Sequence, residues 1–316
     1  MVNKKNIAMR DVIVCLLIFV PNEGHGMHRI LRATQMVTGA CLVGGGMLIE
    51  GYGRERLKKS ELDGFEMSKD VQLFTRSVIR KIDVQAAESV TLLVDKNDAA
   101  SEWSAEYDKV ILVDPIINKK LEIILHKKDI IEAEKKFLAL HTMLIKHELK
   151  HYISQDSHNL IYACAVIPAM IQTGSTALRY GFNRIFKIEQ PKKIIPALLR
   201  SSLSVASLIP KIGVSFLGFI IYRQYIERQA DKFACEHAET RQELEEYHKF
   251  FMDIHYSDQK SFLHNKGIDL DSMSPWKRYF LMKFDYFTHD PAHPCPEDRG
   301  TDVQYYLGKW DEEHKN

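Results

Sequence analysis

The chain has 316 residues, of which 45% are hydrophobic and 27% charged, a composition typical of a protein with a sizeable buried core. Its formal net charge of +1 gives no electrostatic reason to expect a nucleic-acid partner, and neither a P-loop nor a dinucleotide fingerprint is present. The cysteines are odd in number and scattered, so they indicate neither a disulfide framework nor a cysteine metal knuckle: Cys15, Cys41, Cys164, Cys235 and Cys295.

Residues 1–59 contain two apolar runs and are expected to form one or more membrane-associated segments. The first run, DVIVCLLIFVP, is short for a bilayer span. The second, ATQMVTGACLVGGGMLI (residues 33–49), is uncharged and lies near the lower limit for a spanning helix, which needs about 17 to 25 residues. The alternative for the second run is a glycine-rich buried segment of a soluble fold.

Residues 60–316 are expected to form the main domain, mainly α-helical with a small β-sheet. Residues 60–81 place apolar side chains at helical spacing, which predicts an amphipathic helix. Residues 89–96 and 109–116 are apolar and β-branched, and predict two strands joined by the polar turn NDAASEWSAEYD. Residues 129–152 predict one long amphipathic helix, with a small β element beside it.

The long helix carries the motif HELKH near its end. Residues four apart share one helix face, so His147 and His151 can direct imidazole nitrogens at one metal ion. Glu148, beside the first ligand, can take a proton from a metal-activated water as that water attacks a carbonyl. The motif is therefore typical of a Zn²⁺-dependent hydrolase, while the plainer interpretation is a solvated helix with two ordinary histidines.

Two apolar runs follow the motif and predict a hairpin at about residues 159–222. Residues 159–178 carry no charge, and residues 201–222 carry only Lys211. Each is long enough for a helix of about 30 Å, the thickness of a bilayer core. We therefore expect a membrane-associated hairpin; the alternative is a buried hairpin within a soluble enzyme.

A third metal ligand is predicted just after the hairpin, in the charged helical segment that begins at Arg223. A catalytic zinc site uses three protein ligands and leaves one position open. Glu227 and Asp231 are four residues apart, so Glu227 can bind the metal while Asp231 supports a ligand histidine through a hydrogen bond.

The motifs HELKH, ERQAD and HPCPEDR resemble, in this order, the HExxH, ExxAD and HPxxxxR motifs of the membrane-embedded gluzincin peptidases. This family contains the HtpX heat-shock protease and the CAAX prenyl protease, and the resemblance covers roughly residues 89–299. It implies a zincin-like catalytic domain with a membrane hairpin inserted between the zinc motifs. It also implies that His293 and Arg299 face the substrate carbonyl or position the peptide. His289 is the alternative, but the position of Arg299 favours His293.

The resulting expectation is a membrane-associated zinc endopeptidase that cleaves proteins or peptides, chiefly membrane or membrane-associated proteins, in quality control or processing. One Zn²⁺ per chain and a lipid bilayer are the expected cofactor and partner. Lysine and arginine are more numerous near the predicted spans on the active-site side than in the connector between them, which favours a cytoplasmic active site. Two alternatives stay open: a soluble zinc metallopeptidase and a non-catalytic zinc-binding membrane scaffold.

Overall fold

The structure, a computed structural model, describes residues 66–95, 103–106, 110–156, 208–290 and 293–315, with scattered helical positions between 159 and 185. All of them belong to one of two structural units, Leu57–Asn316. The predicted segments in residues 1–59 and the beginning of the predicted polar turn, residues 97–102, lie outside the described part. So does most of the first half of the predicted hairpin.

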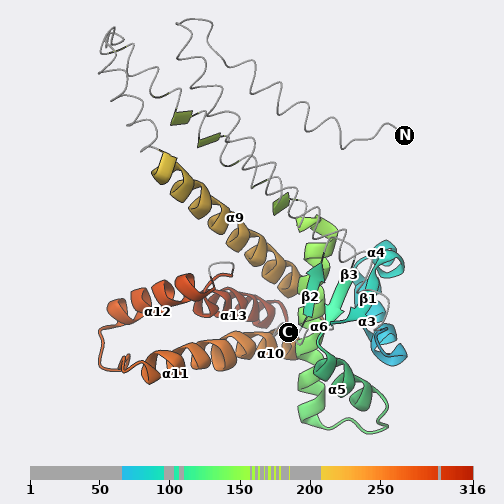
Figure 1. Ribbon diagram of the computed structural model, residues 1–316. Coiled ribbons are helices and arrows are strands. Elements are labelled where there is room, and N and C mark those ends of the chain that lie inside the picture. Colours follow the sequence, from blue (N-terminus) through green and yellow to red (C-terminus); the bar gives the residue numbers. More distant parts are fainter. Residues whose placement is uncertain are drawn as a thin grey trace, which may run out of the picture. The chain divides into compact units, whose positions relative to one another are not determined.

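Helices dominate the described residues, and a small sheet accompanies them, as the sequence predicts (Figure 1). The helices are α3 (Lys69–Ile82), α4 (Val84–Ser89), α5 (Pro115–Leu125), α6 (Glu132–Ser154), α9 (Leu208–Glu236), α10 (Arg241–Lys249), α11 (Ser257–Asn265), α12 (Pro275–His289) and α13 (Pro296–Glu313). A π-helical segment, η1 (Phe250–Tyr256), continues α10. The strands are β1 (Thr91–Val94), β2 (Trp103–Glu106) and β3 (Val110–Val113).

The sheet has the strand order β1-β3-β2, so among the described strands β2 is paired on one side only. β1 pairs with β3 in parallel, and β2 pairs with β3 antiparallel, with Ala105 opposite Ile111. The strands β1 and β3 confirm the two predicted strands. β2 was missed, because it lies within the segment predicted as a polar turn and Trp103 is its only large apolar residue.

α6 is the central helix, and its position explains the burial of the HELKH motif. It contacts β2 and β3 of the sheet as well as α3, α9 and α10, so its middle turns are buried on most sides. The helix ends at Gln155, which adopts a left-handed conformation with φ 53°. This turn brings the next residue, Asp156, back against the last turn of the helix.

The main core lies between the sheet, α3, α6, α10 and α13. Tyr247 of α10 and Phe251 of η1 are its largest fully buried aromatic side chains, and Trp103 of β2 is almost as buried. α13 contributes Gly300, Val303 and Leu307 from one face, so the carboxyl-terminal helix is amphipathic. The hairpin of α11 and α12 has a second, smaller core around Leu263, Leu270 and Met282.

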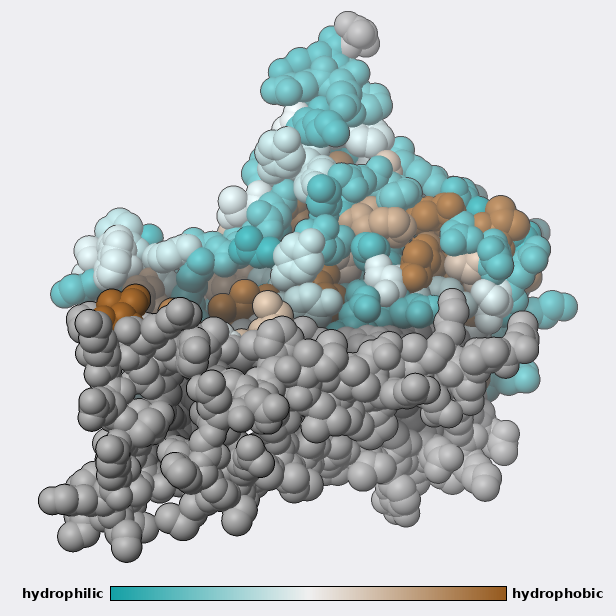
Figure 2. Space-filling view, turned by 90° about the horizontal axis from the view of Figure 1, so that it is seen from above, coloured by the Kyte–Doolittle hydropathy of each residue, from teal (hydrophilic) through white to brown (hydrophobic). Residues whose placement is uncertain are grey.

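Within the described part of the chain, we find no helix that combines the length and the apolar character needed to cross a bilayer. α9 is 29 residues long, but its uncharged stretch between Lys211 and Arg223 is about half of the ~20 residues that a span needs. The prediction of a transmembrane helix, and with it of an integral membrane location, is therefore wrong on the described residues. The described part of the face shown in Figure 2 is mostly hydrophilic, with hydrophobic residues in separate patches.

Candidate metal centre

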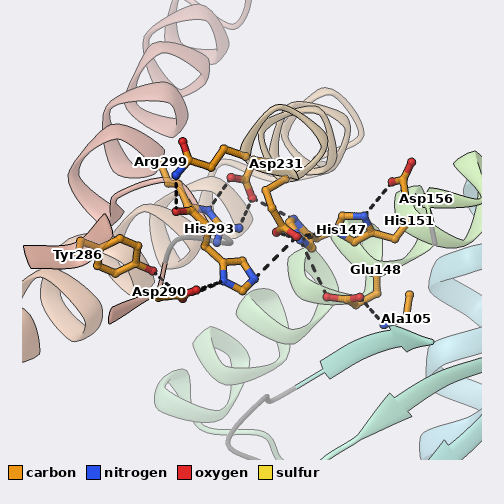
Figure 3. A network of polar contacts seen from close by, with 12 residues as sticks. Ala105, His147, Glu148, His151, Asp156, Asp231, Tyr286, Asp290, His293 and Arg299 are labelled. Atoms are coloured by element: carbon orange, nitrogen blue, oxygen red, sulfur yellow. Dashed lines mark hydrogen bonds and ion pairs between the residues drawn. The ribbon is translucent and has the colours of Figure 1, made fainter. Parts of the chain in front are cut away.

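Three predicted ligands meet where α6 crosses α9 (Figure 3). The Nε2 atoms of His147 and His151 lie 3.1 Å apart. Glu227 of α9 completes the triangle, with Oε2 3.4 Å from Nε2 of His147 and Oε1 3.7 Å from Nε2 of His151. The cluster is enclosed: the Glu227 residue is 9% exposed, and the side chains of the two histidines are 6% and 13% exposed.

Each histidine is oriented by a carboxylate on its other nitrogen. Nδ1 of His147 lies 2.9 Å from Oδ1 of Asp231, and Nδ1 of His151 lies 2.9 Å from Oδ2 of Asp156. A neutral imidazole that donates from Nδ1 carries its lone pair on Nε2. Two lone pairs that face each other at 3.1 Å repel, so this arrangement needs a proton or a cation between the rings.

The spacing of the ligand atoms fits a tetrahedral metal ion. Zinc binds histidine nitrogen and carboxylate oxygen at about 2.0–2.2 Å, and the edges of such a tetrahedron measure about 3.3–3.6 Å. The three observed separations of 3.1, 3.4 and 3.7 Å bracket that range. The residues present can therefore hold a metal with three protein ligands and leave a fourth position open.

The charges of the cluster also favour a bound cation. Burial by itself lowers the pKa of His147, but hydrogen bonds to Asp231 and Glu227 outweigh it and raise the pKa to about 10. Burial by itself raises the pKa of Glu227, yet the neighbouring imidazoles hold that pKa below its usual range. Without a metal, the cluster therefore retains a proton where a cation would lie.

Glu148 lies beside the cluster and is not one of its ligands. Its Oε1 is 4.0 Å from Nε2 of His147, and its Oε2 accepts a 2.5 Å hydrogen bond from the backbone N–H of Ala105 in β2. Burial raises the pKa of Glu148, the charges of the two histidines oppose that rise, and the net shift is upward. An upward shift suits a general base, which works best with a pKa near the working pH.

Asp231 connects the cluster to the carboxyl-terminal helix. Arg299 of α13 donates to both of its oxygens, from Nε at 2.7 Å and from Nη2 at 2.6 Å, and Tyr247 of α10 donates its hydroxyl at 2.5 Å. Burial raises the pKa of Asp231, but the charges of Arg299 and His147 more than reverse this and lower the pKa. Arg299 thus contacts the carboxylate that bonds His147, while its predicted role toward the substrate carbonyl or the peptide stays a prediction.

His293 approaches the cluster from the segment between α12 and α13. Its Nε2 lies 3.8 Å from Oε1 of Glu227, and its Nδ1 lies 2.8 and 3.0 Å from the two oxygens of Asp290. The hydroxyl of Tyr286 donates to Asp290 at 3.2 Å. The imidazole is 35% exposed, which is more than the side chain of any other predicted site residue.

The structure thus gathers all seven predicted site residues: His147, Glu148, His151, Glu227, Asp231, His293 and Arg299. Sequence reasoning missed the supporting residues Ala105, Asp156, Tyr247 and Asp290. Asp156 and Asp290 carry a signal, since each lies a few residues from a predicted histidine. Tyr247 and Ala105 carry none, because α10 and β2 reach the site only through the tertiary fold.

Comparisons of the chain with known protein families, with curated proteins and with solved structures found no match.

Proposed function

We propose that this protein is a zinc-dependent endopeptidase. The observation that carries the proposal is the pair of Nε2 atoms 3.1 Å apart, with each Nδ1 held by a carboxylate and Glu227 at the third corner. Three ligands of this kind with an open fourth position are typical of catalytic zinc sites, whereas structural sites use four protein ligands. The resemblance of the three sequence motifs to gluzincin peptidases supports the same assignment.

Glu148 is the proposed general base. Bound Zn²⁺ would polarise the scissile carbonyl and acidify the attacking water. Glu148 would accept the proton of that water and return it to the leaving amine, since its carboxylate lies beside the ligands without being one of them. The hydrogen bond from Ala105 orients one of its oxygens and leaves the other directed at the cluster.

His293 is the proposed electrostatic partner of the tetrahedral oxyanion. It lies next to Glu227 and is more exposed than the three proposed ligands, and Asp290 fixes its orientation by bonding Nδ1. With Nδ1 held, Nε2 faces the cluster, and in the imidazolium form it would donate to the oxyanion. Arg299 serves the same reaction indirectly, because its bidentate contact holds Asp231 against His147.

The proposed substrate is a protein or peptide bound in an extended conformation. Within the part of the chain that the structure describes, β2 is paired with β3 alone, and the N–H of Ala105 on its other edge reaches Glu148. An extended peptide can add to such an edge through backbone hydrogen bonds, which select conformation more than sequence. This edge would bring a scissile bond alongside the metal ligands.

The test compares the purified, zinc-loaded protein with its Glu148→Gln variant in the cleavage of an unfolded model protein. We expect the wild type to cleave, a chelator to stop it, and the variant to bind zinc equally while its cleavage falls by about 10²- to 10⁴-fold. Glu132→Gln, an exposed substitution at the start of the same helix, is the matched control. Equal cleavage by wild type and Glu148→Gln would contradict the mechanism. A tightly bound zinc without any cleavage by the wild type would instead favour a non-catalytic zinc protein.

A further inference from the structure

β2 is held against α6 by two hydrogen bonds that involve side chains of that helix. The backbone N–H of Ala105 donates to Glu148, and the indole Nε1 of Trp103 donates to Nδ1 of His141 at 3.0 Å. His141 and Glu148 are seven residues apart, about two helical turns, so they lie on one face of α6. The two contacts therefore attach one short strand to one face of the catalytic helix.

His141 occupies an unusual place for a histidine. It is 1% exposed, and its ring packs edge-on against Phe137 at 4.1 Å between centroids. Burial and the nearby charge of Lys120 lower its pKa to about 3, so the ring is neutral. Since Nδ1 accepts the indole N–H, the proton of the ring is on Nε2, which has no hydrogen-bond partner within the described residues.

An unpartnered N–H in a core is unfavourable, and an apolar side chain would avoid it. An apolar side chain, however, offers no hydrogen-bond acceptor for the indole N–H of Trp103. Trp103 is itself buried, at 5% exposure, and its indole N–H would lose its partner in turn. The specific role of His141 is therefore to accept the bond from Trp103.

The bond matters for the site because it fixes the register of β2. Trp103 precedes Ala105 by two residues, so their side chains lie on the same face of the strand. A slip of one residue would move every side chain of β2 to the opposite face and remove the Ala105 N–H from Glu148. Only four residues pair β2 with β3, so the ladder by itself resists such a slip weakly.

We propose that Trp103 and His141 are positioning residues, which lock β2 in the register that lets the Ala105 N–H orient Glu148. The lock acts through Ala105, and neither side chain contacts the metal ligands. Its consequence for catalysis rests on the proposed function, whereas its effect on β2 does not.

The first test measures amide hydrogen exchange at Ala105 in the full-length protein with Trp103→Phe, which keeps an aromatic ring and removes the donor. We expect exchange about tenfold faster than in wild type, the size of effect expected for one buried hydrogen bond. Trp276→Phe, at a tryptophan that is 73% exposed on α12, is the control and should leave Ala105 exchange unchanged. Unchanged exchange in Trp103→Phe would overturn the proposal.

A second variant, His141→Leu, removes the acceptor and keeps the site apolar. If the two residues act as one lock, Trp103→Phe/His141→Leu exchanges at Ala105 no faster than the faster single variant. If the increases in exchange rate of the two single variants multiply in the double variant, each substitution disturbs the packing independently, and the proposal is overturned.

In the zinc-loaded enzyme, either variant should lower kcat about tenfold while zinc affinity and KM stay within about twofold, because Glu148 acts in the chemical step. Lower zinc affinity with unchanged kcat would contradict the positioning role. If the wild type cleaves nothing, the exchange result still decides the register lock, so the two hypotheses fail separately.

Discussion

Asp231 accepts more hydrogen bonds than any single role would require. It holds His147 through Nδ1, and it receives two bonds from Arg299 and one from Tyr247. A buried carboxylate that bonds a cationic imidazole needs such compensation, because burial disfavours its charge. The arginine and the tyrosine therefore keep Asp231 ionised and fixed, and Asp231 in turn keeps the metal-facing nitrogen of His147 in place.

We expect Arg299→Lys to weaken zinc binding about tenfold or more. A lysine retains the charge but cannot make the bidentate contact, so Asp231 and His147 lose their fixed orientation. Competition with a calibrated chelator measures the affinity. Arg228→Lys is the control, because Arg228 is 45% exposed on the same helix as Asp231 and bridges Asp298. Equal zinc affinity for wild type and Arg299→Lys would show that Arg299 does not act through Asp231.

His141 predicts a specific sensitivity to acid. Its folded pKa of about 3 lies below the ordinary value of about 6.5, so between these values the unfolded chain binds more protons. The stability that neutral His141 contributes is complete above pH 6.5 and is lost as the pH falls toward 3, by up to about 1.4 kcal/mol per pH unit. Urea unfolding at several pH values measures the slope. The free energy of unfolding of His141→Leu should depend less steeply on pH between 3 and 6.5. An equal slope in wild type and variant would contradict the lowered pKa of His141.

Among the helices, α6 and α10 are joined by a buried ion pair. Nζ of Lys146 lies 2.7 Å from Oε2 of Glu243 and also donates to the backbone carbonyl of His237. Lys146 immediately precedes the proposed metal ligand His147, and its side chain is 1% exposed. The pair therefore sets the position of α10, which carries Tyr247, relative to the motif.

Lys146→Met should destabilise the protein by about 3–5 kcal/mol, because it leaves Glu243 buried without its partner. Lys146→Met/Glu243→Met should cost clearly less than the sum of the two single variants. The free energy of unfolding in urea provides the measurement. Lys81→Met, which breaks an exposed pair with Glu239, should change it by no more than about 0.5 kcal/mol. Additive costs for Lys146 and Glu243 would contradict direct coupling.

The elements that the sequence predicted well are those with a local signal. The spacing of four residues within α6 determines that His147 and His151 share a face, and the apolar strands β1 and β3 are recognisable from composition. β2 was missed because its alternation is short and its pairing with β3 is set by the fold. The hairpin was assigned to a membrane on its apolar content, whereas α9 continues without a break from its apolar part into the ligand Glu227.

At the scale of the whole molecule, the site draws on distant parts of the chain. α6 and α9 supply the ligands, β2 orients Glu148, α10 and α13 hold Asp231, and the segment after α12 supplies His293. No local segment can assemble these groups, so the geometry exists only in the folded state. A metal that binds there must therefore stabilise the fold as a whole.

We expect Zn²⁺ to raise the melting temperature and a chelator to reverse the rise. At a free concentration of 100 times Kd, the stabilisation is about 2.7 kcal/mol, which corresponds to roughly 5–10 °C for a unit of this size. Differential scanning calorimetry measures the melting temperature of the protein with Zn²⁺ and with the chelator. Glu227→Gln, which replaces a carboxylate ligand by an amide, should lose most of the rise.

Glu236→Gln is the control for the same helix, because Glu236 is 45% exposed and forms an ion pair with the exposed Lys232. This variant should keep the full rise. A rise of equal size in Glu227→Gln and Glu236→Gln would place the stabilising zinc elsewhere. Equal melting temperatures with zinc and with chelator would contradict a folded-state metal site. Because His147 and Glu227 are 80 residues apart in the chain and lie on different helices, loss of the metal should also expose the amides of both helices to exchange together.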